Sequence, residues 1–340
     1  MAETAYEKWQ KTEGIPIYQG AYIADLYALE LSDWARVGQR GAFVNLAGQQ
    51  QDDAFVIEIA PQSQTDVMHH LFEAVTFVLD GRGATTFWQE GHPKQTVEWQ
   101  RGSVFSPPLN CYYQHFNAQG QRPARLFTVT NAPMVINMFR NADFVFEDAY
   151  IFADRYAGED DYFSGGGEES GRDTWISNFI PDIRAFTLKE RIGNRAVRDV
   201  HRVFAMANNQ MALHSSEFET GIYKKAHRHG VGAHVIVLAG TGYSLLWREG
   251  EERQKVDWKD GSVLSPREQE YHQHFNTGPE PARYLAVRLG GLDSRRWGGE
   301  VPRHQIEYEY EDPAVYDQYV EECARHGADV VLPRPRYASG

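Results

Sequence analysis

The sequence predicts an all-β protein that contains two copies of one antiparallel β-barrel. A set of glycine, tryptophan, serine and proline positions recurs at an offset of 159 residues, so that Gly81 and Pro107 in the first copy correspond to Gly240 and Pro266 in the second. Within each copy, short runs rich in β-forming residues are separated by glycine turns, as in VTFVLDGRGATTFW and HVIVLAGTGYSLLW. A register held over so many positions indicates an internal duplication, and runs of this kind close on themselves as a barrel.

Length, composition and charge narrow the class of protein. The chain has 340 residues, 42% of them hydrophobic, which is enough to bury a full core. A formal net charge of -13 argues against nucleic acid and against an anionic membrane as partners. No apolar run reaches the roughly eighteen residues that a membrane span requires, and the N-terminus lacks a targeting pattern. We therefore expect a cytoplasmic protein that binds small molecules, with association into a homo-oligomer left open.

The repeat divides the chain into expected parts. We assign residues 51–140 to the first barrel and residues 206–292 to the second, because the recurring positions fall inside these ranges. Residues 1–50 are expected to form an N-terminal arm that packs on the barrels. Residues 141–205 join the barrels and contain an acidic, glycine-rich stretch at 156–172, which is typical of a solvated loop.

One helix is expected in the C-terminal segment, residues 293–340. The stretch AVYDQYVEECARHG has apolar residues at helical spacing. The start and stop signals around it are an N-cap, a proline at the first helical position and a terminating glycine, at Asp312, Pro313 and Gly327.

Histidine spacing in the second copy indicates a metal site. His227 and His229 are two residues apart, so on a strand both side chains face the same way. His272 and His274 repeat this spacing farther along the chain. In an antiparallel barrel the two segments can lie side by side, which would bring three or four imidazoles together in one barrel mouth. Imidazole is a ligand that suits iron, zinc, copper and nickel.

At these positions the chain resembles the cupin superfamily, whose two motifs run G-x5-H-x-H-x(3,4)-E-x6-G and G-x5-P-x-G-x2-H-x3-N. The first motif is matched at its spacing by Gly221, His227, His229 and Gly240. The second is matched more loosely by Gly261, Pro266, His272 and Asn276. Its proline comes one residue early, and Glu268 stands where the motif has its second glycine. Because both copies share the pattern, the resemblance implies a bicupin: two tandem double-stranded β-helix (jelly-roll) barrels, here with an N-terminal arm and a C-terminal helix.

The acid of the first cupin motif is missing, because Ala233 stands seven residues before Gly240. The resulting pattern H-R-H-x3-A resembles the three-histidine cupins, most closely the gentisate 1,2-dioxygenases and their salicylate and hydroxynaphthoate relatives, which are iron(II) ring-cleaving bicupins. The resemblance implies an Fe(II) ion on His227, His229 and His272, with Mn, Ni or Zn as alternative metals.

The first copy has lost the same ligand positions. Met68 stands for His227, Tyr113 for His272, and Ala74 at the acid position, so that only His70 is kept. In the resembling dioxygenases the metal lies in the first barrel. We expect it only in the second barrel of this chain.

Four further residues are candidates for the site. His274 has a counterpart, His115, in the copy without ligands, so we expect it to support the site by hydrogen bonding. His234 lies one residue past Ala233 and should face away from the pocket, although a bulge at the neighbouring glycines would make it an alternative ligand. Arg283 and Arg288 are candidates for holding a substrate carboxylate, and because they are five residues apart only one can face inward on a regular strand.

The expected function is that of a non-haem Fe(II)-dependent dioxygenase. Three neutral imidazoles leave three adjacent metal positions free and the metal charge uncompensated, which favours a chelating anionic substrate together with dioxygen. The substrate would be a hydroxybenzoate-like aromatic compound or a diketone, cleaved at a carbon–carbon bond. The alternatives are a lyase, isomerase or decarboxylase that uses Mn, Ni or Zn, and a ligand-binding bicupin without catalysis.

Overall fold

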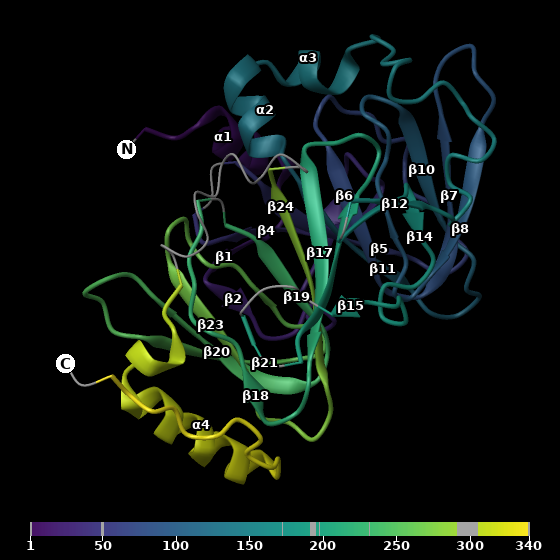
Figure 1. Ribbon diagram of the computed structural model, residues 1–340. Helices are drawn as coiled ribbons and strands as arrows, with labels where there is room; N and C mark the ends of the chain where they lie inside the picture. Colours follow the sequence, from purple (N-terminus) through teal and green to yellow (C-terminus); the bar gives the residue numbers. More distant parts are fainter. Residues whose placement is uncertain are drawn as a thin grey trace.

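Two antiparallel β-barrels that follow the internal repeat make up most of the molecule (Figure 1). The computed structural model describes residues 2–48, 51–171, 173–190, 195–196, 198–230, 232–290 and 305–338. The first barrel lies on the right of Figure 1 and the second below it on the left. The predicted all-β, tandem-barrel fold is therefore confirmed.

The first barrel combines a long sheet with a short one. The long sheet has the order β1-β4-β5-β11-β6-β9-β14, with β3 beside β4, and consists of β1 (Ile17–Gly20), β3 (Ser32–Trp34), β4 (Gln39–Leu46), β5 (Asp53–Ile59), β6 (Ala74–Asp80), β9 (Val104–Phe105), β11 (Ala124–Thr130) and β14 (Phe179–Ile180). The short sheet has the order β10-β7-β8 and consists of β7 (Arg82–Trp88), β8 (Gln95–Gln100) and β10 (Tyr112–Asn117).

The second barrel repeats this arrangement. Its long sheet has the order β12-β13-β16-β17-β24-β19-β22-β2, with β15 beside β16, and consists of β2 (Tyr22–Ile23), β12 (Glu168–Ser170), β13 (Thr174–Ile176), β15 (Lys189–Glu190), β16 (Val200–Ala205), β17 (Met211–Phe218), β19 (His234–Ala239), β22 (Val263–Leu264) and β24 (Ala282–Leu289). Its short sheet has the order β18-β23-β20-β21 and consists of β18 (Ile222–Tyr223), β20 (Thr241–Trp247), β21 (Gln254–Lys259) and β23 (Tyr271–Asn276).

The barrels exchange short strands, which differs from the expected division of the chain. In sequence, β2 lies between β1 and β3 of the first barrel, but it pairs with β22 of the second. Likewise, β14 lies between β13 and β15 of the second barrel, but it pairs with β9 of the first. β4 lies within residues 1–50 and is a full strand of the first barrel. The expected arm and the expected joining segment therefore supply strands to the sheets, because each short strand satisfies an open sheet edge.

The described residues form four α-helices outside the barrels: α1 (Ala5–Glu13), α2 (Ala132–Phe139), α3 (Ala142–Glu147) and α4 (Pro313–His326), with a 3-10 turn at Tyr308–Tyr310. The predicted C-terminal helix is α4, whose first turn is capped by Asp312 and which ends at Gly327 with a φ of 76°. It packs on the outside of the short sheet of the second barrel (Figure 1). Residues 293–304 of the expected C-terminal segment lie outside the described residues. No helix in the described part of the chain has the length and apolar character needed to cross a membrane.

Alternation along the strands decides which side chains reach a barrel interior. On β24, Tyr284 and Ala286 belong to the apolar core inside the second barrel. Leu285 and Val287 belong to a different core, which fills the space between the two barrels. This parity fixes the orientation of the other residues on the strand.

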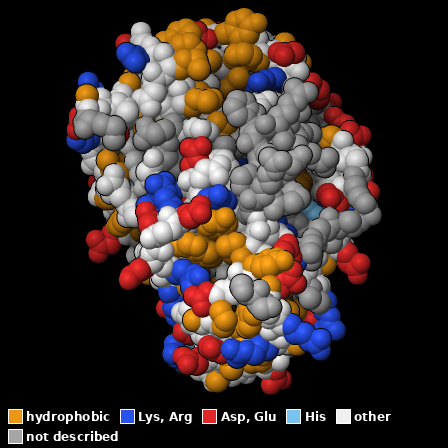
Figure 2. All heavy atoms as spheres, turned by 60° about the vertical axis from the view of Figure 1, so that its left-hand side comes forward, with side chains coloured by type: hydrophobic (Ala, Val, Ile, Leu, Met, Phe, Trp, Pro, Cys, Tyr) orange, Lys and Arg blue, Asp and Glu red, His pale blue; other side chains and the backbone are white. Residues whose placement is uncertain are grey.

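The surface is mixed in charge. On the face drawn in Figure 2, acidic and basic side chains are interspersed. Apolar side chains gather at the upper end of that view, the end at which α2 and α3 lie in Figure 1. The exposed apolar residues of these two helices are Met138, Phe139 and Phe144.

Candidate metal centre

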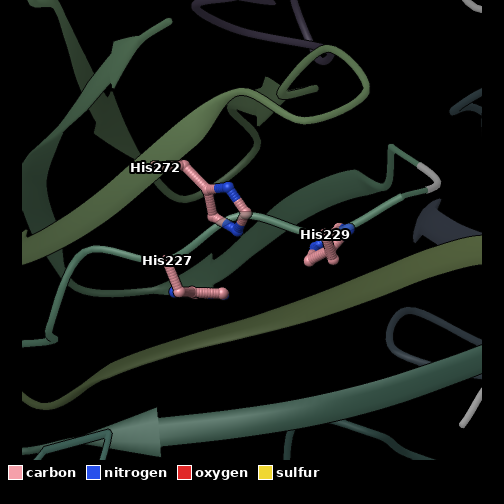
Figure 3. Close-up of side chains that lie close together, drawn as sticks. All are labelled: His227, His229 and His272. Carbon is pink, nitrogen blue, oxygen red and sulfur yellow. The ribbon is translucent and has the colours of Figure 1, made fainter. Parts of the chain in front are cut away.

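Three imidazoles converge in the mouth of the second barrel. His227 and His229 lie on the segment before β19, and His272 lies on β23 (Figure 3). His227 and His272 form a cross-strand pair through backbone hydrogen bonds of 3.1 and 2.9 Å. One nitrogen of each ring lies within 4.8 Å of the others. Among the described residues, no other group of three histidine, cysteine or acidic side chains is brought together in this way.

Two of the three histidines, His227 and His272, are held neutral, as metal binding requires. Burial lowers the pKa of His272 to about 4, and the positive charges of Arg195 and Arg288 act in the same direction. Burial also lowers the pKa of His227 well below its ordinary value. The Nδ1 atom of His272 lies 3.1 Å from the carbonyl of Glu270. Because a carbonyl only accepts, Nδ1 carries the proton and Nε2 presents its lone pair.

The donor set fits a divalent transition metal. Imidazole nitrogen is a ligand for iron, nickel, copper and zinc, and it binds manganese more weakly. Three nitrogens on one side leave room for further ligands on the other, which is the arrangement of a catalytic rather than a closed structural site.

The equivalent positions of the first barrel are satisfied without a metal. Met68 and Tyr113 form the cross-strand pair that corresponds to His227 and His272. The remaining imidazole, His70, donates from Nδ1 to the carbonyl of Phe72 at 2.8 Å, and its Nε2 accepts from the Tyr113 hydroxyl at 2.7 Å. The lone pair that would bind a metal is therefore engaged in a hydrogen bond.

A cavity lies at the mouth of the first barrel. Its volume is about 450 Å³, and its walls include Trp9, Trp34, Phe72, Phe146 and Met68. Aromatic rings thus occupy the end of the barrel at which the second barrel holds its histidines.

A tryptophan, a hydroxyl group and a histidine form the same hydrogen-bonded chain in each barrel. The residues are Trp258, Ser244 and His274 in the second barrel and Trp99, Thr85 and His115 in the first. In the second barrel the hydroxyl accepts from the indole N–H at 3.0 Å and lies 2.8 Å from Nδ1 of the imidazole. In the first barrel the two distances are 2.9 and 2.7 Å. Because the first barrel keeps this chain without the three histidines, it stabilises the barrel frame and orients His274 beside His272.

His234 faces away from the three histidines. It shares strand parity with Ile236 and Leu238, which belong to the core between the barrels, whereas Ala233 belongs to the core inside the second barrel. Its Nε2 lies 3.5 Å from Oδ1 of Asp52, and both side chains are fully buried. Val231, which lies between His229 and His234 in the sequence, is outside the described residues.

Of the two candidate arginines, Arg288 lies on the inward face. It shares parity with Tyr284 and Ala286. The strands β19 and β24 run antiparallel, and His234 lies opposite Val287. One residue farther along this pairing, Ala233 lies opposite Arg288. The backbone of Arg288 thus lies opposite the position at which the cupin motif has its acidic ligand, and its charge acts on His272.

Arg283 lies on the opposite face of β24, towards the first barrel. Its Nε donates to Glu217 at 2.7 Å, and its Nη1 donates to three carbonyls at 2.6 to 3.0 Å. Arg125 of the first barrel makes the equivalent contacts with Glu58 and with three carbonyls of the exchanged N-terminal segment. Arg283 is thus engaged in the frame, and Arg288 is the arginine that lies near the histidines.

Sequence reasoning missed other charged neighbours of the centre. Arg195, in the joining segment, lowers the pKa of three of the histidines by its charge, and its carbonyl accepts from the backbone of Lys225 at 2.8 Å. Lys224 and Asp199 form a buried ion pair with an Nζ to Oδ1 distance of 2.7 Å. Alternation counted back from His227 would set Lys224 on the opposite face, so no local pattern indicated this pair.

Comparison with known proteins supports the fold. The sequence matches no protein-family model and no curated protein. A tryptophan-to-phenylalanine variant of oxalate decarboxylase from Bacillus subtilis has a similar structure, with a TM-score of 0.54, 11% identity and coverage of 81% of this chain and 78% of that chain. The formate complex of oxalate decarboxylase from Lactobacillus farciminis has a TM-score of 0.54 and 10% identity, with coverage of 88% of this chain and 93% of that chain. Vicilin from Capsicum annuum has a TM-score of 0.52 and 12% identity, with coverage of 79% of this chain and 86% of that chain.

At such identities the similarity concerns the fold alone. It confirms the bicupin architecture that the motifs predicted. These structural neighbours are oxalate decarboxylases and a vicilin, so they give no support to the expected likeness to gentisate dioxygenases.

Proposed function

We propose that the second barrel binds a divalent metal ion through His227, His229 and His272, and that the protein is a metal-dependent enzyme acting on a small, chelating anion. The observation that carries this proposal is the convergence of three imidazoles near the charge of Arg288, with no acidic ligand. When bound, the metal would act as a Lewis acid that polarises a substrate oxygen.

Charge around the centre favours an anionic substrate. Imidazoles contribute no negative charge, so the full double charge of a metal ion would remain. Arg195 and Arg288 add positive charge close enough to depress the pKa of His272. A guanidinium binds a carboxylate through two parallel hydrogen bonds. Arg288 would therefore hold a substrate carboxylate at the place that the cupin acid leaves vacant.

The first candidate reaction is a non-oxidative one, in which Mn, Ni or Zn serves a decarboxylase, lyase or isomerase. Two of the structural neighbours are oxalate decarboxylases, which shows that this fold can carry such chemistry. Arg288 would orient the carboxylate, and the aromatic and aliphatic lining of the barrel would exclude water.

A second candidate is an Fe(II)-dependent dioxygenase that cleaves a carbon–carbon bond. The missing acid at Ala233 favours it, because three open positions accommodate a bidentate substrate and leave room for dioxygen as co-substrate. Hydroxybenzoates and β-diketones are the substrate classes that chelate in this way.

Metal analysis followed by activity assays separates these candidates. The purified protein should contain one divalent transition metal per chain. Oxygen-electrode traces with hydroxybenzoates and β-diketones then test the dioxygenase, and anaerobic release of carbon dioxide from oxalate and related acids tests the decarboxylase. Absence of stoichiometric metal after reconstitution would contradict both candidates and favour a ligand-binding bicupin.

A further inference from the structure

A buried polar cluster lies on the inward side of the second barrel. Nζ of Lys224 donates to Asp199 Oδ1 at 2.7 Å, to Ser216 Oγ at 2.6 Å and to the Tyr284 hydroxyl at 3.2 Å. The side chains of Lys224 and Asp199 are each 1% exposed. All three ammonium protons are therefore used within the protein.

This cluster lies next to the metal centre, on the side away from the barrel mouth. The backbone N–H of Lys224 donates to the carbonyl of His274 at 2.9 Å, which sets these two residues opposite each other. His227 and His272 form the neighbouring cross-strand pair towards the barrel mouth. The ring centroids of His272 and His274 are 5.7 Å apart, and those of His274 and Tyr284 are 5.4 Å apart. A continuous line of side chains thus leads from the histidines to Tyr284.

The first barrel shows that the frame does not need this cluster. The backbone N–H of Thr65 donates to the carbonyl of His115, as that of Lys224 donates to the carbonyl of His274. A neutral residue therefore takes the place of the lysine in the first barrel. The positions of Ser216 and Tyr284 are occupied there by Ile57 and Leu126, which pair across β5 and β11 as the other two pair across β17 and β24. A buried ion pair is costly to desolvate and commonly adds no stability over apolar residues. Its presence only in the barrel with three histidines indicates a role in the site.

Tyr284 is the member of the cluster that can serve a ligand. Its ring lies on the inward face of β24, between the small residues Ala282 and Ala286. Its oxygen accepts from Lys224, and an ammonium group can only donate. The hydroxyl proton is therefore left for another acceptor, and none is found for it in the described part of the chain.

We propose that the Tyr284 hydroxyl donates a hydrogen bond to a substrate oxygen that does not bind the metal, and that Lys224 and Asp199 hold this hydroxyl in position. The proposal rests on the proposed function, since it requires a ligand at the metal. It narrows the substrate class to compounds with a chelating anionic end and a second oxygen acceptor on the far side, such as dicarboxylates and oxo-acids or hydroxy-acids.

The test uses the full chain loaded with Co(II), whose absorption spectrum reports anion binding. Oxalate and acetate are the probes, because chelated oxalate has two oxygen atoms on the side away from the metal, where acetate has only a methyl group. Tyr284→Phe should raise the Kd of oxalate about tenfold or more, as expected for loss of a hydrogen bond to a charged acceptor. The Kd of acetate and the cobalt content should not change. An unchanged Kd for oxalate would overturn the proposal.

Two further variants separate positioning from stability. Tyr113→Phe removes the hydroxyl at the metal-free centre and should leave the Kd of both anions unchanged. Lys224→Thr combined with Asp199→Asn should weaken oxalate binding as Tyr284→Phe does, while Tm stays the same or rises. A large fall in Tm with unchanged oxalate binding would show that the pair is only structural. A wild-type protein that fails to bind cobalt, or binds it but neither anion, would contradict the proposed function itself.

Discussion

The two barrels share one frame and differ in what fills it. Both keep the tryptophan–hydroxyl–histidine chain and the arginine that binds a glutamate and three carbonyls. At the mouth, the pair Met68 and Tyr113 in the first barrel corresponds to the pair His227 and His272 in the second. The comparison teaches that hydrogen bonds buried in the walls maintain the fold, whereas a few inward side chains decide whether a barrel can hold a metal.

The largest difference should appear in metal content. His229→Ala removes one of three converging nitrogens and should strip most of the metal from the protein, whereas His70→Ala should leave the metal content unchanged because the Nε2 of His70 is engaged by Tyr113. Elemental analysis after dialysis measures both. Equal loss from the two variants would contradict the assignment of the site to the second barrel.

Two arginine variants compare the inside of the second barrel with the region between the two barrels. Arg288→Gln should weaken binding of a carboxylate to the metal-loaded protein by about 10- to 100-fold, since a charge-assisted bond is lost. Arg283→Gln should leave that affinity unchanged and lower Tm instead, because it removes contacts to Glu217 and three carbonyls. Calorimetric titration with oxalate checks the first effect, and a reversed pattern would refute the orientation of β24.

Acid sensitivity probes the buried histidines of the first barrel. Burial lowers the pKa of His70 and of His115 to about 3. An unfolded histidine has a pKa of about 6.5, so between these values the unfolded chain binds more protons. The free energy of unfolding should therefore fall as pH is lowered from about 6.5 towards 3, by up to about 1.4 kcal/mol per pH unit for each histidine.

Urea unfolding of the metal-free protein at several pH values measures this slope. The second barrel also contains buried histidines, so the variant His70→Gln isolates the contribution of the first. Its slope should be smaller than that of the wild type by about 1.4 kcal/mol per pH unit. An unchanged slope would mean that His70 does not stay neutral in the folded state.

The smallest expected effect comes from rebuilding the lost site. Met68→His with Tyr113→His would place three imidazoles in the first barrel at positions equivalent to those of the second. We expect a second metal ion with an affinity about 10- to 100-fold weaker, because the new imidazoles would lie among aromatic rings that are packed for a site without metal. Titration with Co(II) measures the second equivalent. Its complete absence would show that the aromatic walls, and not the ligands alone, exclude the metal.

The sequence allowed prediction of the repeated part of the fold. The constant offset identified two barrels, and the cap and terminating glycine of α4 gave its limits. The helix α1 was missed although Thr4 and Glu7 form a capping box, because its apolar residues make sense only against the first barrel. The strand exchange by β2 and β14 was also missed, since strands of two residues carry no periodicity and their partners are set by tertiary packing.

The candidate site was predictable where spacing determines geometry. His227 and His229 share a face by alternation, and His272 follows from the second motif. Strand parity showed that only one of Arg283 and Arg288 faces inward, but the choice between them needed the register of β24. Lys224 follows β18 and Asp199 precedes β16, so packing alone brings the two together and no local pattern reveals the pair.

Crystallography with anomalous scattering from a protein loaded with Mn(II) or Co(II) tests the central claim most directly. We expect one anomalous peak per chain, in the second barrel, bonded to His227, His229 and His272 at about 2.0 to 2.2 Å, a distance typical of imidazole ligands. A peak at His70 in the first barrel, or a His234 nitrogen within about 2.5 Å of the metal, slightly beyond such bond lengths, would contradict the account.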